Sequence, residues 1–335
     1  YGGAQDVGIK APPSVKFELI WQALSQENCL LCVNELCRIA GVSRSGYYNW
    51  VRSEDRRRQR EAADRADFEL ILDAYKYRGY AKGARGICMV LLRKSKPMNL
   101  KKVRRLMKKY RLVCPIRRIN PYRRQMQALH SGNVADNLVK REFREHGARK
   151  ILLTDITYLY YRNQRCYLST ILDAYTREVL AYQLSESLEI EFVLDTVSGL
   201  VAKYGAELDD EVIVHSDQGC HYTSKAFIQA LRDGKLRQSM SQKGVCWDNA
   251  PQESFFGHMK DEIAELLSKQ PTFDKVKAVV DDWIDYYNNE RYQWDLLKLS
   301  PHEYYEYVTT GALPSEIAAY LRCNVASEKS ISVQG

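Results

Sequence analysis

One apolar segment, residues 151–161 (ILLTDITYLYY), constrains the fold most because it carries an acid, Asp155, in its middle. A short run of β-branched and aromatic residues is typical of a buried strand. A second such run, residues 212–214, ends in His215-Ser216-Asp217-Gln218-Gly219. A carboxylate on a buried strand is costly unless it is paired or binds a metal ion. The fold must therefore give Asp155 and Asp217 partners.

A third acid, Glu253, lies in the first turn of an amphipathic helix predicted over residues 249–269. Carboxylates brought to one point repel one another, and hard divalent cations relieve that repulsion by accepting oxygen ligands. Two such ions would activate an attacking oxygen and stabilise a leaving oxygen at a phosphodiester. Three unrelated structural acids are the alternative interpretation.

The spacing and the surrounding strings point to a known family. Thirty-five residues separate Asp217 from Glu253, and the chain contains HSDQG, SMSQKGVCWDNAPQESFFGHMKDE and YYNNERYQW followed by LSP. This pattern resembles the catalytic core of bacterial insertion-sequence transposases of the OrfB or OrfAB type. These are DDE transposases, related to retroviral integrases. The resemblance covers most of the chain, from Lys16 to about Tyr305.

The resemblance implies a specific chemistry. Asp155, Asp217 and Glu253 would be the catalytic residues and the ligands of two Mg²⁺ ions, with Mn²⁺ as a substitute. The protein would bind terminal inverted repeats, cleave DNA at the element ends and join the freed 3′-hydroxyl to target DNA. Because two ends must be held together, at least a homodimer on DNA is expected. Lys260 shares a helical face with Glu253 and is placed to contact a DNA phosphate.

The order of the predicted elements gives the fold class. Three hairpin-connected strands precede alternating helices and strands, which predicts an α/β domain with a mixed five-stranded sheet covered by helices. That order matches the ribonuclease H-like fold of the resembled family. The strands are expected over 151–161, 166–174, 179–185, 212–214 and 236–240, and the core helices over 189–204, 224–233 and 249–269. Asp248 or Asn249 would cap the last helix, whose buried stripe would comprise Phe256, Met259, Ile263 and Leu266.

Small all-α modules are predicted before this core. Residues 34–40 and a helix capped by Ser43 form a helix-turn-helix signature, whose second helix would place Arg44, Ser45 and Tyr47 on DNA. A plain helical hairpin is the alternative. Further helices are expected over 54–66, 68–77, 84–93 and 100–110. The last would present a basic face to DNA, formed by Lys101, Lys102, Arg105, Lys108 and Lys109.

The charge distribution supports an anionic partner. The formal net charge is +8, and residues 93–125 contain fourteen Lys or Arg and no Asp or Glu. A solvated helix face and a basic linker could also account for this block. Nine scattered cysteines indicate a reducing compartment, and no apolar run is long enough to span a bilayer. We therefore expect a cytoplasmic, nucleoid-associated bacterial protein.

The sequence predicts four domains and one linker. Two functions other than transposition remain as alternatives. A metal-dependent nuclease on the same fold would only hydrolyse DNA, and a domesticated regulator would bind DNA without cutting it. The expected domains are a helix-turn-helix module (1–57), a second basic helical module (58–112), a basic linker (113–148), the catalytic core (149–270) and a helical extension (271–335).

Overall fold

The computed structural model describes residues 11–26, 30–115, 146–241 and 250–322. The chain divides into two compact units, residues 1–69 and residues 70–335. The expected caps Asp248 and Asn249 lie outside the described residues. No helix within the described ranges is long and apolar enough to cross a membrane.

The first unit contains three short helices, α1 (Pro13–Leu24), α2 (Val33–Ala40) and α3 (Arg44–Arg52). Gly41 ends α2 in the left-handed conformation, with φ 62°, which glycine adopts without a steric penalty. The Ser43 hydroxyl accepts a hydrogen bond from the Gly46 amide at 3.1 Å and so caps α3. The predicted helix–turn–helix succession is therefore present.

Tyr47, one of the residues predicted to contact DNA, is largely buried. Its side chain is only 4% exposed and packs in a small core with Ile20 and Cys37, so its DNA contact stays a prediction. The two other α3 residues predicted to contact DNA, Arg44 and Ser45, are exposed, so their DNA contacts stay predictions.

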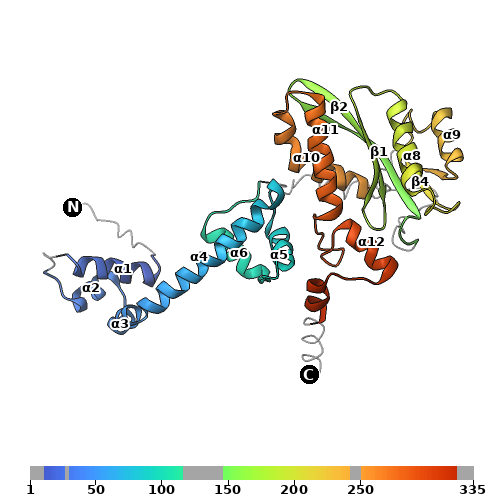
Figure 1. The fold of residues 1–335 in the computed structure, drawn as a ribbon. Coiled ribbons are helices and arrows are strands. Elements are labelled where there is room, and N and C mark those ends of the chain that lie inside the picture. The colour runs from blue at the N-terminus through green and yellow to red at the C-terminus, as the bar shows by residue number, and fades with distance from the viewer. Residues whose placement is uncertain (1–10, 27–29, 116–145, 242–249, 323–335) are drawn as a thin grey trace, which may run out of the picture. The chain divides into compact units, whose positions relative to one another are not determined.

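The next helix, α4 (Glu54–Lys76), is continuous where two helices separated at Asp67 were expected (Figure 1). The segment contains neither glycine nor proline, and most of its residues favour a helix, so nothing in it ends one. The helix therefore runs through the predicted domain boundary at residue 57, and that boundary stays a prediction.

Helices α5 (Ala84–Arg93) and α6 (Leu100–Lys109) follow in the second unit, close to the predicted bounds. The Asn99 side chain caps α6 by accepting a hydrogen bond from the Lys101 amide at 2.7 Å. Val103, Leu106 and Met107 are buried, as expected for the apolar face. The basic residues occupy the opposite, more exposed face of α6.

The predicted mixed five-stranded sheet is confirmed. Its strands lie in the order β3-β2-β1-β4-β5. The pairs β1–β2 and β2–β3 are antiparallel, while β1–β4 and β4–β5 are parallel. The strands are β1 (Ile151–Tyr161), β2 (Gln164–Asp173), β3 (Val179–Ser185), β4 (Ile213–Ser216) and β5 (Arg237–Met240).

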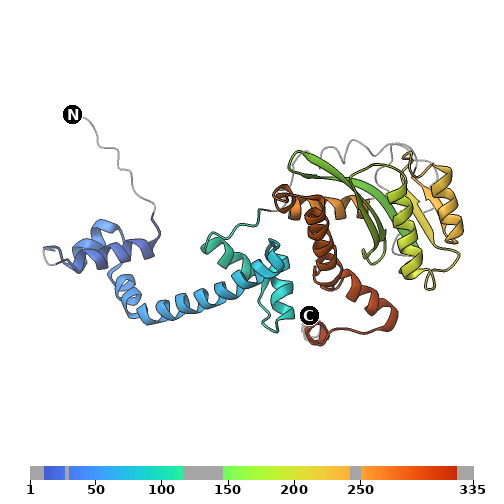
Figure 2. The same ribbon diagram turned by 45° about the horizontal axis from the view of Figure 1, so that its top comes forward.

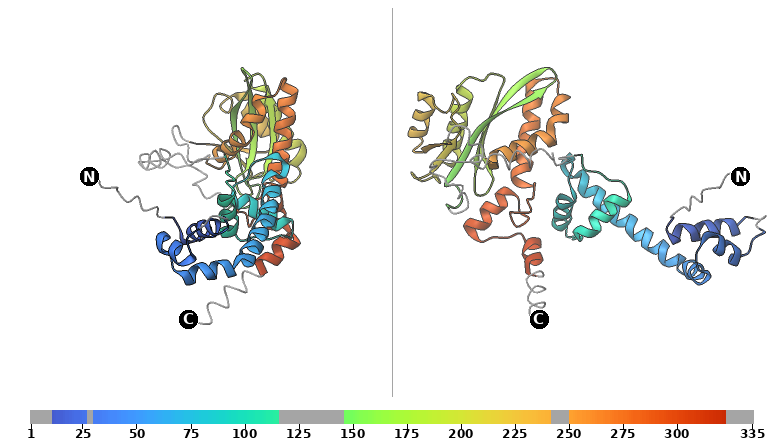
Figure 3. Two further views of the ribbon diagram at one scale, coloured as in Figure 1. Left: turned by 90° about the vertical axis from the view of Figure 1, so that its left-hand side faces the viewer. Right: turned by 180° about the vertical axis from the view of Figure 1, so that it is seen from behind.

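Helices cover both faces of the sheet (Figures 1 and 3). On one face Leu152 and Ile171 pack with residues of α8 (Glu191–Tyr204) and α9 (Lys225–Asp233). On the other face Leu159 and Leu168 pack with residues of α10 (Ala250–Ser268) and α11 (Phe273–Asn289). Alternate strand residues thus separate two hydrophobic clusters.

The expected stripe on α10 needs one correction. Phe256, Met259 and Ile263 are buried as predicted, but Leu266 is 39% exposed and Leu267 is buried at 1%. From Ile263 the stripe continues by four residues rather than three. A period of 3.6 residues permits either step, and contact with α11 selects Leu267.

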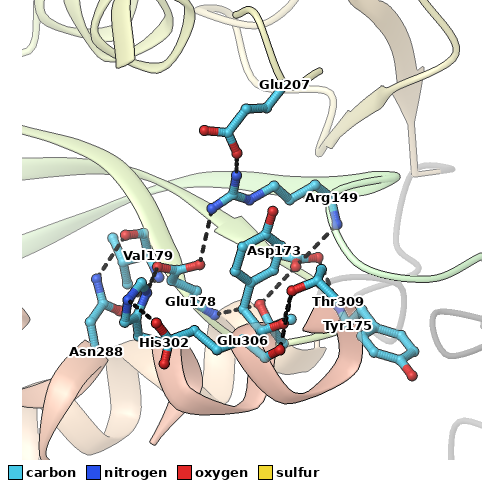
Figure 4. A network of polar contacts seen from close by, with 12 residues as sticks. Arg149, Asp173, Tyr175, Glu178, Val179, Glu207, Asn288, His302, Glu306 and Thr309 are labelled. Carbon is cyan, nitrogen blue, oxygen red and sulfur yellow. Dashed lines mark hydrogen bonds and ion pairs between the residues drawn. The ribbon is translucent and has the colours of Figure 1, made fainter. Parts of the chain in front are cut away.

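Polar contacts attach helix α12 (Pro301–Thr310) to the core, as Figure 4 shows. His302 Nδ1 lies 3.0 Å from a carboxylate oxygen of the buried Glu178, which faces Arg149. The Arg149 guanidinium lies over the Tyr305 ring at 3.8 Å and pairs with Glu207. These contacts join α12, the β2–β3 turn and the start of β1.

Candidate active site

The strand register brings two of the predicted acids to the same edge of the sheet. The last β1–β4 pair is Leu153 with His215, and Asp155 and Asp217 each follow by two residues, just beyond the paired part of the two strands. Asp155 is half-buried within β1, whereas Asp217 is exposed beyond the end of β4. Both acids therefore lie where β1 and β4 diverge.

A tight turn holds the carboxylate of Asp217. The Gly219 amide donates a hydrogen bond to Asp217 Oδ1 at 2.8 Å. A Cβ atom on residue 219 would lie only 2.9 Å from the same oxygen. Glycine at this position therefore allows the backbone to approach and orient the carboxylate.

The third acid is brought to the same edge by α10. Glu253 lies in the first turn of that helix and is exposed. Its neighbour Gln252 is fully buried and donates a hydrogen bond to the Thr170 hydroxyl. Thr170 is the β2 partner of Asp155. The first turn of α10 is therefore attached to the sheet beside Asp155.

The electrostatics of Asp155 reflect this convergence. The pKa of Asp155 is raised to about 7, mainly by burial. The carboxylates of Asp217 and Glu253 contribute to this rise because each opposes a second negative charge. Against these effects, a 2.8 Å hydrogen bond from the Ile156 amide and the nearby ammonium of Lys260 favour the ionised form. The three predicted acids thus share one electrostatic environment.

The donor set is chemically suited to a hard divalent cation. Three carboxylates that repel one another supply oxygen ligands of the kind Mg²⁺ accepts. Among the residues that the structure describes, however, no group of three His, Cys, Asp or Glu lies close enough to hold one ion in this conformation. The side chains of Asp217 and Glu253 are exposed, so both carboxylates are accessible to an ion from solvent.

Lys260 lies beside the acids, as its helical position predicted. Its Nζ atom lies 5.4 Å from the centre of the Tyr158 ring. Burial lowers the pKa of Lys260, and the Asp155 carboxylate partly offsets that effect. A half-buried ammonium next to a carboxylate group can contact a phosphate held at the acids, although this role stays a prediction.

Two further residues at this edge were not identified from sequence. Tyr222 is buried, and burial together with the charges of Asp155 and Asp217 raises the pKa of its phenol well above its ordinary value. Gln252 does carry a sequence signal, since it precedes Phe256, Met259 and Ile263 at helical spacing and so belongs to the buried stripe. No periodicity marks Tyr222.

The predicted DNA-binding residues of α6 do not lie on the elements that carry the acids. Lys101, Arg105, Lys108 and Lys109 are exposed on the outer face of α6, and Lys102 is partly exposed. The histidines nearest the acids in sequence have other contacts, since His215 Nδ1 lies 3.0 Å from the Ser239 hydroxyl and His221 Nε2 lies 2.8 Å from the Leu188 carbonyl. The basic face on α6 is a separate feature, and its DNA contacts stay predictions.

Comparison with known protein families agrees with this architecture. Two models described as an integrase core domain match residues 145–246 and 235–301. A model described as an HTH-like domain matches residues 61–119. The integrase core matches the residues that form the sheet, which confirms the predicted ribonuclease H-like fold class.

Similar proteins come from insertion elements. The putative transposase InsK of insertion sequence element IS150 from Escherichia coli K12 is 30% identical over 274 residues, covering 81% of this chain and 93% of that protein. An uncharacterised transposase-like protein of Haemophilus influenzae is 35% identical over 216 residues, covering 64% of this chain and 95% of that protein.

Among solved structures, a simian T-cell lymphotropic virus intasome in complex with PP2A regulatory subunit B56 gamma aligns with 12% identity and a TM-score of 0.44. The alignment covers 73% of this chain and 77% of that chain. With the family-model matches and the relatives' coverage, the assignment is clear: the chain belongs to the family of insertion-sequence transposases with an integrase core domain.

Proposed function

We propose that this transposase binds the ends of its insertion sequence and catalyses metal-dependent DNA strand cleavage and strand transfer. The observation that carries the proposal is the shared environment of Asp155, Asp217 and Glu253 at the edge between β1 and β4. Family membership supports DNA transposition as the process, and the three acids supply a chemical means for it.

The roles follow from the position of each side chain. Asp155, Asp217 and Glu253 would hold two Mg²⁺ ions, or Mn²⁺ in their place. When bound, the ions would supply Lewis acidity at the scissile phosphate and an activated water or 3′-hydroxyl as nucleophile. The Gly219 amide fixes one oxygen of Asp217, which leaves the other available as a ligand.

Neighbouring residues would position the DNA and the acids. Lys260 would contact a phosphate oxygen beside the acids and so hold the scissile bond in place. Gln252 fixes the rotation of α10 through Thr170 and hence the direction in which Glu253 points. The phenol of Tyr222 stays protonated and adds no further negative charge to the site.

DNA would be recognised outside the catalytic core. The exposed Arg44 and Ser45 on α3 would contact one segment of the terminal repeat, and the basic face of α6 would contact phosphates. Because both element ends must be held for joining, we propose that at least two copies act together on DNA. We propose that DNA binding of this kind associates the protein with the bacterial nucleoid.

The proposal is tested by cleavage of a labelled duplex that carries the terminal sequence of the element. The parent protein should cut with Mg²⁺ and not with EDTA, and Asp155→Asn and Asp217→Asn should each abolish cutting while leaving DNA binding intact. The matched control is Asp209→Asn, since Asp209 is exposed and pairs with the partly exposed Lys150. Cutting by Asp155→Asn at the parent rate would refute the proposal, whereas cutting without joining would indicate a nuclease.

A further inference from the structure

The β1–β2 hairpin carries an exposed aromatic and basic surface near the acids. Tyr158 is 49% exposed and Tyr160 is 61% exposed, which is unusual for large rings on a strand. In the antiparallel register Tyr158 lies opposite Tyr167, and Tyr160 lies opposite the exposed Arg165. Directly opposite residues share one face of a sheet. We call this surface, formed by Tyr158, Tyr160, Arg165 and Tyr167, the hairpin platform.

The hairpin platform begins where the helical cover of its face ends. On the same face Leu152 and Ile171 are fully buried, and Ile156 and Tyr167 are partly buried at the edge of that cluster. Figure 2 shows the tip of the β1–β2 hairpin extending past α8. Tyr158 and Tyr160 are therefore not needed to close the core, and folding alone does not explain two exposed rings at this place.

The charge of the hairpin fits a nucleic acid. Residues 156–172 contain no Asp or Glu, while Arg162 and Arg165 lie at its tip. Lys260 Nζ lies 5.4 Å from the Tyr158 ring and also interacts with the Asp155 charge. Asp155 and Tyr158 lie on opposite faces of β1, and Lys260, which lies near both, connects the hairpin platform to the candidate active site that the proposed function assigns to DNA.

The rings indicate which part of DNA would bind. Phosphates are contacted by Lys and Arg, whereas an exposed tyrosine ring offers a flat surface on which a base can stack. Exposed aromatic residues on a sheet stack two or three unpaired bases in a common RNA-binding module. Base faces inside a duplex are already stacked, so only unpaired nucleotides can use such rings. Tyr158 and Tyr160 are about 6.8 Å apart along the strand, which leaves room for one base at each ring.

We propose that the hairpin platform binds unpaired bases of the DNA strand next to the scissile phosphate, with Tyr158 and Tyr160 as stacking residues. The inference rests on the proposed function for the identity of the DNA, but not on the occurrence of cleavage. It would position a frayed strand end at the acids and favour ends whose terminal pairs open easily.

The test measures binding of the full chain to a duplex end with a single-stranded tail and to the same end fully paired, in EDTA so that no cleavage occurs. Each of Tyr158→Leu and Tyr160→Leu should weaken the tailed complex about tenfold and leave the paired complex unchanged. The controls Tyr158→Phe and Tyr160→Phe keep the ring and should bind as the parent does.

Salt dependence separates stacking from phosphate contact. Arg165→Gln should lower the slope of log affinity against log salt by about 0.7 for one lost phosphate contact on a single strand. The leucine variants should leave that slope unchanged. Photocrosslinking of a tail that contains 5-iodouracil should label Tyr158 or Tyr160.

Three results would overturn the inference. They are an unchanged affinity of the leucine variants for the tail, an equal loss on tailed and paired ends, and a change in oligomeric state without a change in tail binding. If instead the tail preference is present and Glu253→Gln retains it, but no strand is cut with Mg²⁺, the hairpin platform stands and the catalytic proposal fails.

Discussion

A buried ion pair on α10, between Glu262 and Arg291, gives a quantitative test of how this helix is attached to the segment after α11. Arg291 bonds Glu262 through two nitrogens, at 2.8 and 3.1 Å to the same carboxylate oxygen. The Trp283 indole N–H donates to the other oxygen at 3.0 Å. The Glu262 side chain is 6% exposed and that of Arg291 is 17% exposed. The pair therefore joins the segment after α11 to the helix that carries Glu253.

Replacing Arg291 by methionine should destabilise the second unit strongly. The substitution leaves the Glu262 carboxylate buried without its cationic partner, which costs about 4 kcal/mol. For a unit of this size that loss lowers Tm by roughly 8–16 °C. An exposed pair at the C-terminal end of α10 is the matched control. Lys269 and Glu265 have side chains 65% and 84% exposed, so Lys269→Met should leave the unfolding midpoint nearly unchanged.

The assay is urea unfolding of the parent, the single variants and the double variant Glu262→Leu/Arg291→Met. Removing both charges should recover most of the loss, except for about 1 kcal/mol from the Trp283 N–H that loses its acceptor. Equal destabilisation by Arg291→Met and Lys269→Met would refute the reasoning. A double variant as unstable as the sum of its single variants would also refute it.

Three further predictions concern the site and its support. Gly219→Ala should leave stability nearly unchanged but reduce strand cleavage about a hundredfold, because its Cβ displaces the Asp217 carboxylate; parent-like cleavage would contradict this. Lys260→Gln should weaken binding to the element end and reduce the salt slope by about 0.9, measured by fluorescence anisotropy, and an unchanged slope would exclude a phosphate contact. Asn288→Leu should cost about 2 kcal/mol in urea unfolding, since Asn288 bonds both the amide and the carbonyl of Val179 at 2.9 Å; a loss below 0.5 kcal/mol would show that water replaces these bonds.

Local patterns accounted for most of the secondary structure. Alternating and β-branched residues located β1 and β3 to the residue, and a polar residue before a helical segment identified the cap Ser43. Each of these signals depends on residues close in sequence, so it can be recognised without the fold. The three acids were identified by spacing together with family strings, and the structure brings them into one environment.

Features that depend on distant contacts could not be predicted. Tyr47 and Tyr48 are adjacent on one helix, and only packing against α1 and α2 makes the first buried and the second exposed. The family string that contains Asn288 and Arg291 was recognised, but their partners Val179 and Glu262 are set by the tertiary fold. Periodicity likewise could not choose between Leu266 and Leu267, because a helix permits both steps.

The central claim is that the acids at the β1–β4 edge form a metal-dependent strand-transfer centre. The most direct test is strand joining with a labelled oligonucleotide that carries the element end, comparing the parent with Glu253→Gln and with the surface control Glu265→Gln on the same helix. With Mg²⁺ the parent and Glu265→Gln should give joined product, and Glu253→Gln should give none while binding the end as tightly. Joined product from Glu253→Gln at the parent level, or product that persists in EDTA, would contradict the account.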